Sequence, residues 1–376
     1  MKCLYYTQTN IEKESGVSKK ILYQVKAFNF LNNDCELCYK YKDSFSVIKK
    51  LYFSNIILDK YNNNFCGKIK NIYRYKKILE YIKKENFNLI YIRYYKDSNP
   101  FFINFLKKIK KHNIKIVLEI PTYPYDNELK EKKLLLRMFY FFERKYRLKM
   151  KKYVDRIVTF SNDNEIFGIK TIKIDNGIDL NEICMIEDKK NDDEINFIIV
   201  AQIAFWHGID RFILSMAEYY KTHQKERIKF HIVGNGEKDT IELLKKLVME
   251  NNLENYVIFY GYKSGKELEK IYNKVNIAVG CLGNHRKGIS YIQPLKNREY
   301  CAKGLPMIFS EKDPGFLNCE FVYKVSEDDK TFDILKIIEW YKNLKISSKE
   351  IRKYSERFIW SKQIKKVMDE INERNI

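Results

Sequence analysis

The chain has 376 residues, 45% of them hydrophobic, which is enough for buried cores and favours two domains over one. Glycine and proline are few, 14 and 6, so the composition excludes a disordered or low-complexity protein. The formal net charge of +21 predicts an anionic partner, whether nucleic acid, an acidic membrane surface or a phosphorylated substrate.

Cysteine usage and apolar segments indicate the compartment. The only close cysteine pair is Cys35-Glu-Leu-Cys38, and a lone pair without a second one indicates free thiols in a reducing cytosol rather than zinc. The first residues lack the apolar segment of a signal peptide, and no apolar stretch reaches the roughly 18–20 residues that span a bilayer. We therefore expect a cytoplasmic protein, soluble or peripheral at the inner face of the plasma membrane.

Strand-like and helix-like segments alternate along the chain, which predicts an α/β protein with parallel sheets. Ser18 is the expected N-cap of the first helix. In the first half we expect strands at 3–7, 89–94, 114–119, 155–161 and 170–174, and helices at 18–31 and 101–112. A polar, aperiodic stretch at 181–194 is the expected linker. The pattern then restarts, with strands at 195–201, 229–234, 257–261, 278–281 and 307–310 and helices at 210–221, 240–251, 265–274 and 295–303.

Several motifs of the second half resemble the retaining family-4 glycosyltransferases. The most specific is Pro294-Leu-Lys-Asn-Arg-Glu-Tyr-Cys-Ala-Lys-Gly-Leu-Pro306. It is supported by Asn176-Gly-Ile-Asp179, Phe205-Trp-His-Gly-Ile-Asp-Arg211, Ile232-Val-Gly-Asn-Gly236 and Tyr260-Gly-Tyr262. The resemblance implies the GT-B fold, with two Rossmann-like domains facing a cleft. It divides the chain into an acceptor-side domain at 1–180, the linker at 181–194, a nucleotide-sugar domain at 195–345, and helices at 346–376 that return to the N-terminal domain.

The residues around 294–299 have a physical basis for binding a diphosphate. Pro294 precedes a predicted helix, so the free N–H groups of Leu295 and Lys296 form an anion site at the helix start. Lys296 adds positive charge. Glu299 lies one turn in, where its carboxylate either accepts hydrogen bonds from ribose hydroxyls or only complements the helix dipole; the surrounding motif favours ribose binding.

Three further donor-side residues follow from the resemblance. Gly234 lies in the turn near the nucleotide base, and Tyr262 lies in the loop that closes the base pocket. Gly16, in the first βα loop, lets the backbone approach the donor phosphates. Each glycine has a simpler interpretation as an ordinary loop or turn residue.

The sequence departs from the family pattern at three positions. Tyr291 stands where the family has the first glutamate of its pair, and Gln202 and His207 stand where it has a cationic Arg and Lys. Replacement cations are Lys296 and Arg298, with Arg211, Lys287 or a protonated His207 as further candidates. Because Lys296 and Arg298 lie about 200° apart on a helix, we expect Lys296 to face the phosphates and Arg298 to be a surface or interdomain residue.

The acceptor side is less specific. The segment Glu119-Ile-Pro-Thr-Tyr-Pro-Tyr125 resembles one found in capsule and surface-polysaccharide transferases, and Arg93, Glu119 and Tyr123 are the acceptor-side candidates. The basic, partly apolar stretch at 130–156 is either a crossover helix with a solvated face or a docking surface for anionic lipid beside a lipid-linked acceptor.

The expected activity is retaining transfer of a sugar from a nucleotide-sugar donor to a glycan or lipid-linked acceptor in capsule, lipopolysaccharide or other surface-polysaccharide biosynthesis. Neither a metal nor another cofactor is expected. The acidic pair Asp192-Asp193 is not interpreted as a metal motif, because it lies in the predicted linker. The main alternative is a catalytically degenerate binding module, favoured by Tyr291. A nucleotide-sugar epimerase would need additional acid–base groups around the sugar, and the sequence shows no His/Asp/Glu cluster for them. No motif supports nucleic-acid binding.

Overall fold

The computed structural model describes residues 1–12, 15–42, 46–51, 56–62, 75–126, 134–187, 194–222, 226–288 and 291–373, with the side chains of 134–139 left out. The chain forms two compact units: Met1–Asp175 with Trp360–Ile376, and Asn176–Ile359. The two α/β domains predicted from the sequence are thus confirmed. The chain passes between the units after Asp175 and after Ile359, and neither point falls in the predicted linker at 181–194. Residues 188–193 of that linker are not among the described residues.

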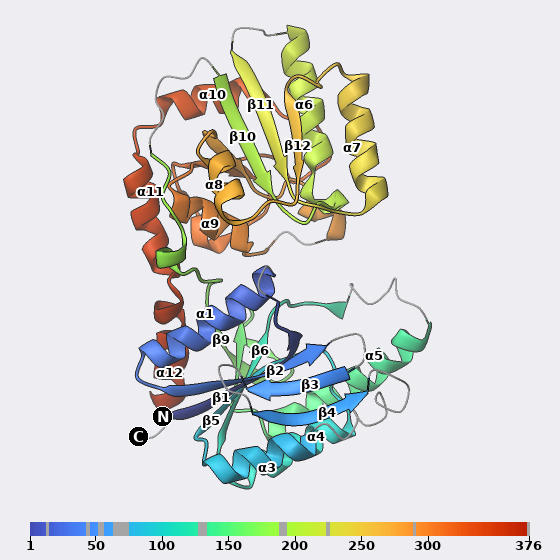
Figure 1. Cartoon of the computed structure of the whole chain (residues 1–376), viewed down its shortest axis with the longest axis vertical. Coiled ribbons are helices and arrows are strands. Elements are labelled where there is room, and N and C mark those ends of the chain that lie inside the picture. The colour runs from blue at the N-terminus through green and yellow to red at the C-terminus, as the bar shows by residue number, and fades with distance from the viewer. Residues whose placement is uncertain are drawn as a thin grey trace. The chain divides into compact units, whose positions relative to one another are not determined.

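The first unit is built on a nine-stranded sheet in the order β4-β3-β2-β1-β5-β6-β7-β9-β8 (Figure 1). The central strands are parallel, whereas β3, β4 and β8 pair antiparallel with their neighbours. The strands are β1 (Lys2–Asn10), β2 (Asp34–Lys42), β3 (Ser46–Leu51), β4 (Ile57–Asn62), β5 (Leu89–Arg93), β6 (Lys115–Ile120), β7 (Arg156–Thr159), β8 (Glu165–Ile166) and β9 (Ile169–Lys173). The helices are α1 (Gly16–Phe30), α3 (Tyr75–Glu85), α4 (Pro100–Lys110), α5 (Leu134–Arg147), η3 (Leu148–Lys152) and α12 (Trp360–Asn372).

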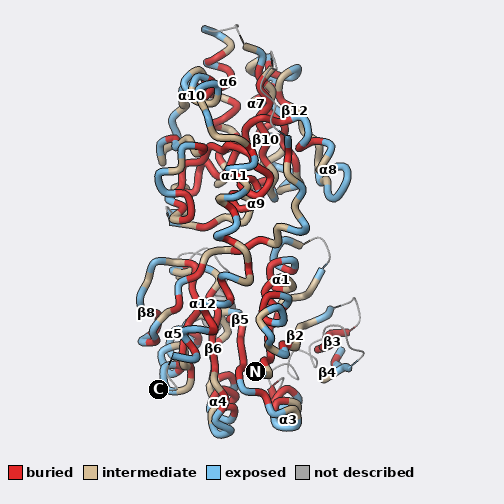
Figure 2. Tube along the Cα trace, turned by 90° about the vertical axis from the view of Figure 1, so that its left-hand side faces the viewer, coloured by how far each residue is buried: buried red, intermediate tan, exposed pale blue. Residues whose placement is uncertain are grey.

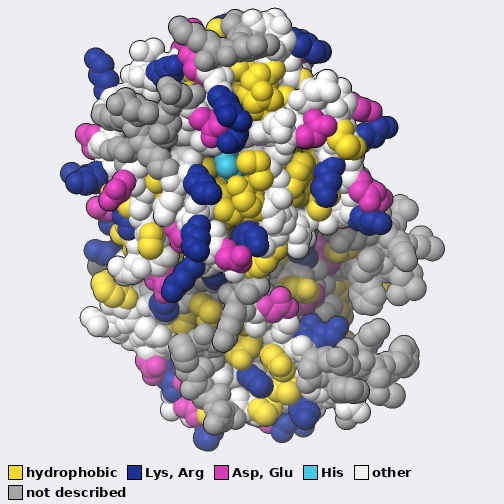
Figure 3. Space-filling view, turned by 45° about the horizontal axis from the view of Figure 1, so that its top comes forward, with side chains coloured by type: hydrophobic (Ala, Val, Ile, Leu, Met, Phe, Trp, Pro, Cys, Tyr) yellow, Lys and Arg dark blue, Asp and Glu magenta, His cyan; other side chains and the backbone are white. Residues whose placement is uncertain are grey.

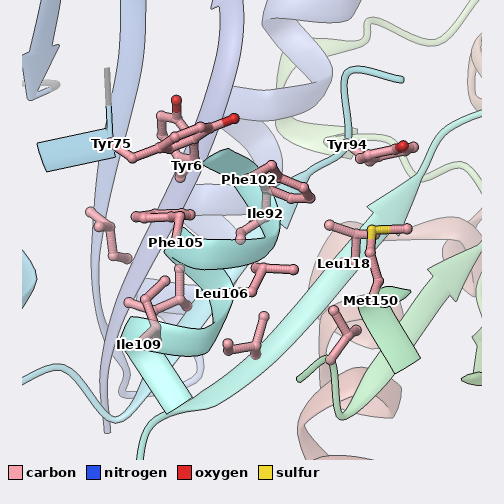
Figure 4. Packing of buried hydrophobic residues seen from close by; sticks show 14 of the residues in the cluster. Tyr6, Tyr75, Ile92, Tyr94, Phe102, Phe105, Leu106, Ile109, Leu118 and Met150 are labelled. Carbon is pink, nitrogen blue, oxygen red and sulfur yellow. The ribbon is translucent and has the colours of Figure 1, made fainter. Parts of the chain in front are cut away.

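Side chains on the two faces of this sheet form two separate cores, because successive residues of a strand point to opposite faces. Leu4 and Tyr6 of β1 pack with α3 and α4, whereas Cys3 and Tyr5 pack with α1 and α12. Figure 4 shows the first core, where Tyr75 stacks on Phe105 with ring centroids 4.5 Å apart. Strands of both units are largely buried, while exposed residues lie mainly on helices and loops (Figure 2).

The second unit contains a fully parallel six-stranded sheet in the order β12-β11-β10-β13-β14-β15. Its strands are β10 (Glu194–Val200), β11 (Arg227–Val233), β12 (Val257–Gly261), β13 (Ile277–Val279), β14 (Met307–Phe309) and β15 (Val322–Lys324). Its helices are η4 (Leu180–Glu182), η5 (Phe205–His207), α6 (Ile209–Thr222), α7 (Lys238–Glu250), α8 (Gly265–Tyr272), η6 (Asn284–Lys287), α9 (Leu295–Lys303), η7 (Pro314–Phe316), α10 (Ile334–Asn343), α11 (Ser348–Ser355) and η8 (Glu356–Phe358). Strand β10 is buried on both faces, as expected of a strand between crossover helices.

The structure corrects two local predictions. The first helix begins at Gly16, and its N-cap is Ser15, whose side chain accepts a hydrogen bond from the Ser18 N–H; Ser18 is therefore not the cap. Of the terminal helices, only α12 joins the first unit, where it packs against α1, while α11 packs against α9 in the second unit. None of the helices within the described ranges is long and apolar enough to cross a bilayer.

Candidate functional site

The strand order of the second unit defines the place where a ligand is expected. From the first strand, β10, the chain continues to β11 on one side, and β13 lies on the other. In open parallel sheets, ligands bind outside the carboxyl ends of the strands at such a reversal point. The loops after β10 and β13, the start of α9 and the end of β14 all lie at this edge.

Two glycines hold the loops of this edge close together. A Cβ on Gly234 would lie 1.8 Å from the Ala201 carbonyl oxygen, and the residue has a φ of +135°. A Cβ on Gly208 would lie 2.7 Å from the Leu282 backbone, at a φ of +65°. Only glycine permits these approaches, so Gly234 has a structural role whether or not it contacts a ligand.

The start of α9 has the features of an anion site. Pro294 is the N-cap and makes no side-chain cap, so the first N–H groups of the helix remain available, and Gly304 closes its other end at a φ of +80°. Among the described residues, the Lys296 ammonium nitrogen is buried and has no hydrogen-bond partner. Burial lowers the pKa of Lys296, although Cys281 and Glu311 oppose this change. A buried, unpaired ammonium beside a helix N-terminus is suited to an anionic ligand.

His207 is neutral in this structure. Its Nδ1 accepts a hydrogen bond from the Ala204 N–H at 3.2 Å. Burial, followed by the charges of Lys296 and Lys287, lowers the pKa of His207 to about 2. The expectation of a protonated His207 concerned the protein with a phosphate bound, and it stays a prediction; without a ligand, the Nε2 of His207 can act as a neutral hydrogen-bond donor.

Arg298 and Arg211 are committed to structural contacts. Arg298 is fully buried in an ion pair with Asp313, and its guanidinium carbon lies 5.1 Å and 5.0 Å from the ring centroids of Phe316 and Phe358. It is thus not the surface residue that the sequence predicted. Arg211 is 1% exposed and donates to backbone carbonyls and to Asp328. Neither is available to replace the missing cations.

Glu311 is a member of this cluster that the sequence did not indicate. It follows β14 and is fully buried, and its Oε1 accepts a hydrogen bond from Asn297 Nδ2 at 3.1 Å. Burial raises the pKa of Glu311 to about 7. Its Oε2 and the Asn297 Oδ1 are buried without a partner within the described part of the chain. The sequence signal that could have indicated Glu311 is its position at the carboxyl end of a predicted strand, where ligands bind in open parallel sheets.

The other donor candidates lie in the two units as follows. In the second unit, Leu295 begins α9, and Gln202, Tyr262 and Glu299 are exposed. The Tyr262 N–H donates to Asn235 in the Gly234 turn, which joins two predicted base-side loops. Tyr291 is 37% exposed and its backbone bridges to Lys312. Gly16, in the first unit, is the first residue of α1 and not the loop residue that the sequence predicted, and no described atom is within 4 Å of the position that a Cβ would take.

The acceptor candidates Arg93 and Glu119 form a buried network at the carboxyl edge of the first sheet. Glu119 pairs with Arg93 and accepts hydrogen bonds from Gln24 at 2.6 Å and Tyr91 at 2.8 Å. Burial alone would raise the pKa of Glu119, but Arg93, Lys20 and these hydrogen bonds lower it. Tyr123 lies apart from this network, against Tyr125 and Phe167. The sequence thus found two residues that the fold brings together and a third that it does not.

No group of three or more histidine, cysteine or acidic side chains suited to a metal ion occurs in the described ranges. Asp192 and Asp193 lie outside the described residues.

Comparisons with known proteins assign the class. The whole chain resembles solved structures: a glycosyltransferase from Rickettsia africae (14% identity, TM-score 0.68, 99% of this chain and 98% of that one), sucrose-phosphate synthase from Thermosynechococcus elongatus (14%, 0.64, 98% and 98%), and the Anabaena protein HepE in complex with UDP (12%, 0.63, 99% and 100%). The fold is that of the GT-B glycosyltransferases. Residues 185–320 match the family described as glycosyl transferases group 1. No curated protein sequence matches the chain. This match lies within the second unit, and together with the fold it identifies the protein as a glycosyltransferase.

Proposed function

We propose that the protein is a retaining glycosyltransferase that uses a nucleotide-sugar donor and acts on a glycan or lipid-linked acceptor in surface-polysaccharide biosynthesis. The observation that carries the donor assignment is the Lys296 ammonium, buried and without a partner beside the free N–H groups at the start of α9. Solved structures with this fold support the donor class: one is a complex with UDP-glucose, and another is a lipopolysaccharide outer core galactosyltransferase.

In this proposal, the donor diphosphate lies at the start of α9 and pairs with Lys296. His207 donates a neutral hydrogen bond to the same phosphates, and Glu299 accepts hydrogen bonds from the ribose. The bond between the sugar C1 and the phosphate oxygen breaks as the acceptor oxygen bonds to C1 on the same face. The acceptor proton passes to the departing phosphate oxygen, so no protein base and no metal ion is invoked. The residues contribute by stabilising the charge that develops on the phosphate.

The test is a binding and transfer screen with UDP-, GDP-, ADP- and CMP-sugars. A cognate donor raises the melting temperature, because it binds the folded state alone. Released nucleoside diphosphate and the anomeric configuration of the product are then measured with lipid-linked and free glycan acceptors. No stabilisation by any nucleotide sugar would refute the donor assignment, and an inverted product would refute the retaining mechanism.

A second candidate, a degenerate binding module, is favoured by Tyr291 and by the neutral state of His207. A neutral His207 supplies less positive charge to a leaving diphosphate than the Lys of the family pattern, and Tyr291 lacks the carboxylate of the family's first glutamate. In the same screen this candidate predicts stabilisation by a nucleotide sugar without release of nucleoside diphosphate.

We also propose peripheral binding to anionic lipid through the end of α5 and η3, on the cytoplasmic side. Phe141, Phe142 and Leu148 are 67%, 49% and 56% exposed. The exposed basic side chains of this segment are Arg144, Lys145, Lys149, Lys151 and Lys152. Exposed apolar side chains edged by lysines are suited to an acidic bilayer surface. Positions 130–133 and the side chains of 134–139 lie outside the described residues.

Vesicle flotation tests this membrane proposal. The protein is expected to float with vesicles that contain phosphatidylglycerol and not with pure phosphatidylcholine, and Phe141→Ser/Leu148→Ser is expected to reduce flotation. Basic side chains, with acidic ones among them, are also spread over the face shown in Figure 3, so positive charge elsewhere on the protein could bind anionic vesicles. The variant Lys245→Ser/Lys246→Ser on α7 is the control for this effect of charge alone. Equal flotation of both variants would refute the assignment of this segment.

A further inference from the structure

The η5 turn presents an aromatic side chain to solvent at the carboxyl edge of the second sheet. Phe205 is 53% exposed. Its ring centroid lies 5.2 Å from that of Trp206 at an interplanar angle of 77°. The Lys287 ammonium lies 4.5 Å from the Trp206 ring centroid. Neither aromatic residue belongs to the hydrophobic cores of the second unit, so core packing does not explain their presence.

The backbone of this turn is held in place. The Phe205 carbonyl accepts a hydrogen bond from Arg286 Nη1 at 2.6 Å, and the Trp206 carbonyl accepts one from Cys281 Sγ at 2.8 Å. Arg286 is itself fixed by two hydrogen bonds to Asp210, at 2.9 Å and 2.8 Å. The His207 N–H closes the turn onto Ala204 at 2.9 Å. An exposed aromatic side chain on a rigid turn binds a ligand with little loss of conformational entropy.

The turn is next to the proposed phosphate site. His207 follows Trp206 directly, and the charges of Lys296 and Lys287 both act on it. Cys281, which donates to Trp206, also lies within electrostatic range of Lys296. A ligand group near Phe205 and Trp206 is therefore close to the place where we expect the donor diphosphate.

We propose that the exposed ring of Phe205, braced edge-to-face by Trp206, forms a stacking platform for the pyranose ring of a substrate, either the donor sugar or a sugar of the acceptor. The C–H face of a pyranose is apolar and slightly positive, and it complements the negative face of an aromatic ring. This inference rests on the proposed transfer of a sugar, and it assigns a residue pair to the sugar itself.

The test uses intrinsic fluorescence and calorimetry of the full chain. Trp206 is one of three tryptophans, and Trp360 is buried, so a sugar at the platform is expected to change the emission of Trp206. The probes are methyl α-D-glucoside, galactoside and mannoside, and the pairs UDP-glucose with UDP, GDP-mannose with GDP, and ADP-glucose with ADP. The variants are Phe205→Ala, Phe205→Leu and Trp206→Phe. Phe30→Ala, which removes an exposed phenylalanine of the other unit, is the matched control.

We expect Phe205→Ala and Phe205→Leu to weaken binding of the sugar-bearing probes about fivefold to tenfold and to leave nucleoside diphosphate affinity unchanged. Trp206→Phe keeps an aromatic face, so it should retain binding and lose the fluorescence change. A loss confined to nucleotide sugars assigns the platform to the donor, and a loss confined to methyl glycosides assigns it to the acceptor.

Two results would overturn the platform: wild-type affinity in both Phe205 variants, or no sugar-dependent signal in the wild type. If the wild type binds methyl glycosides through Phe205 but no nucleotide, the proposed donor function fails and the platform stands.

Discussion

Replacing Lys296 by methionine is expected to stabilise the ligand-free protein and to weaken its binding of nucleoside diphosphate. Methionine has a similar length and no charge, and the ammonium of Lys296 is buried without a hydrogen-bond partner in the described structure. A buried polar group left unsatisfied costs about 1–3 kcal/mol, and a charged one costs more. Lys296→Met should therefore raise the melting temperature by roughly 2–4 °C for each kcal/mol regained.

The same substitution removes the proposed partner of the diphosphate. A hydrogen bond to a charged group contributes about 1.5–3 kcal/mol, which corresponds to roughly 10-fold to 150-fold weaker binding. Scanning calorimetry measures the first effect, and titration calorimetry with the nucleoside diphosphate of the cognate donor measures the second. Lys312→Met is the matched control, because Lys312 is exposed and lies in the neighbouring loop after β14; it should change neither quantity.

The substitution is thus expected to raise stability and to lower nucleotide affinity. A lysine with only a structural role would lower the melting temperature when replaced and would leave nucleotide affinity unchanged. That outcome would show that the ammonium has a partner in the folded protein, and it would remove Lys296 from the phosphate site.

Three further predictions concern the same cluster. Glu311→Gln should flatten the dependence of stability on pH. Because the folded-state pKa of Glu311 is raised to about 7, this residue contributes its full stability below the ordinary carboxyl pKa, and the contribution is lost as the pH rises through 7. In urea unfolding, the difference in free energy between pH 5 and pH 8 should be larger in the wild type than in the variant by up to roughly 3 kcal/mol. Arg298→Met should destabilise the protein by about 3–5 kcal/mol, because it leaves the buried Asp313 carboxylate without its counter-ion. Arg298→Met/Asp313→Asn should recover part of this loss in the same unfolding measurement. Glu299→Gln should weaken nucleotide binding about tenfold with an unchanged melting temperature, since Glu299 is exposed. If the ribose hydroxyls are its partners, 2′,3′-dideoxynucleotides should bind wild type and variant equally in calorimetry.

Local sequence signals predicted the elements of the site well. Pro294 and Gly304 delimit α9 as expected, because proline suits a helix start and glycine tolerates the left-handed conformation that ends one. The apolar runs that become β10 and β11 predicted buried parallel strands, because a strand covered on both faces is apolar along its whole length. These features depend on residues that are neighbours along the chain.

Charge states and long-range pairs were decided by the tertiary structure. His207 is neutral because the fold buries it near Lys296, and Arg298 is buried because its partner, Asp313, follows a different strand. Glu311 carries no sequence motif and joins the site only through Asn297. The repeating α/β pattern and the start of α9 could be read from the sequence, and the same motif led to the proposal of Lys296 as the cation beside that helix start. The side chains that surround Lys296, and those that lose contact with water, follow from the folded structure, because burial and Coulomb energy depend on distances in space and not on positions along the chain.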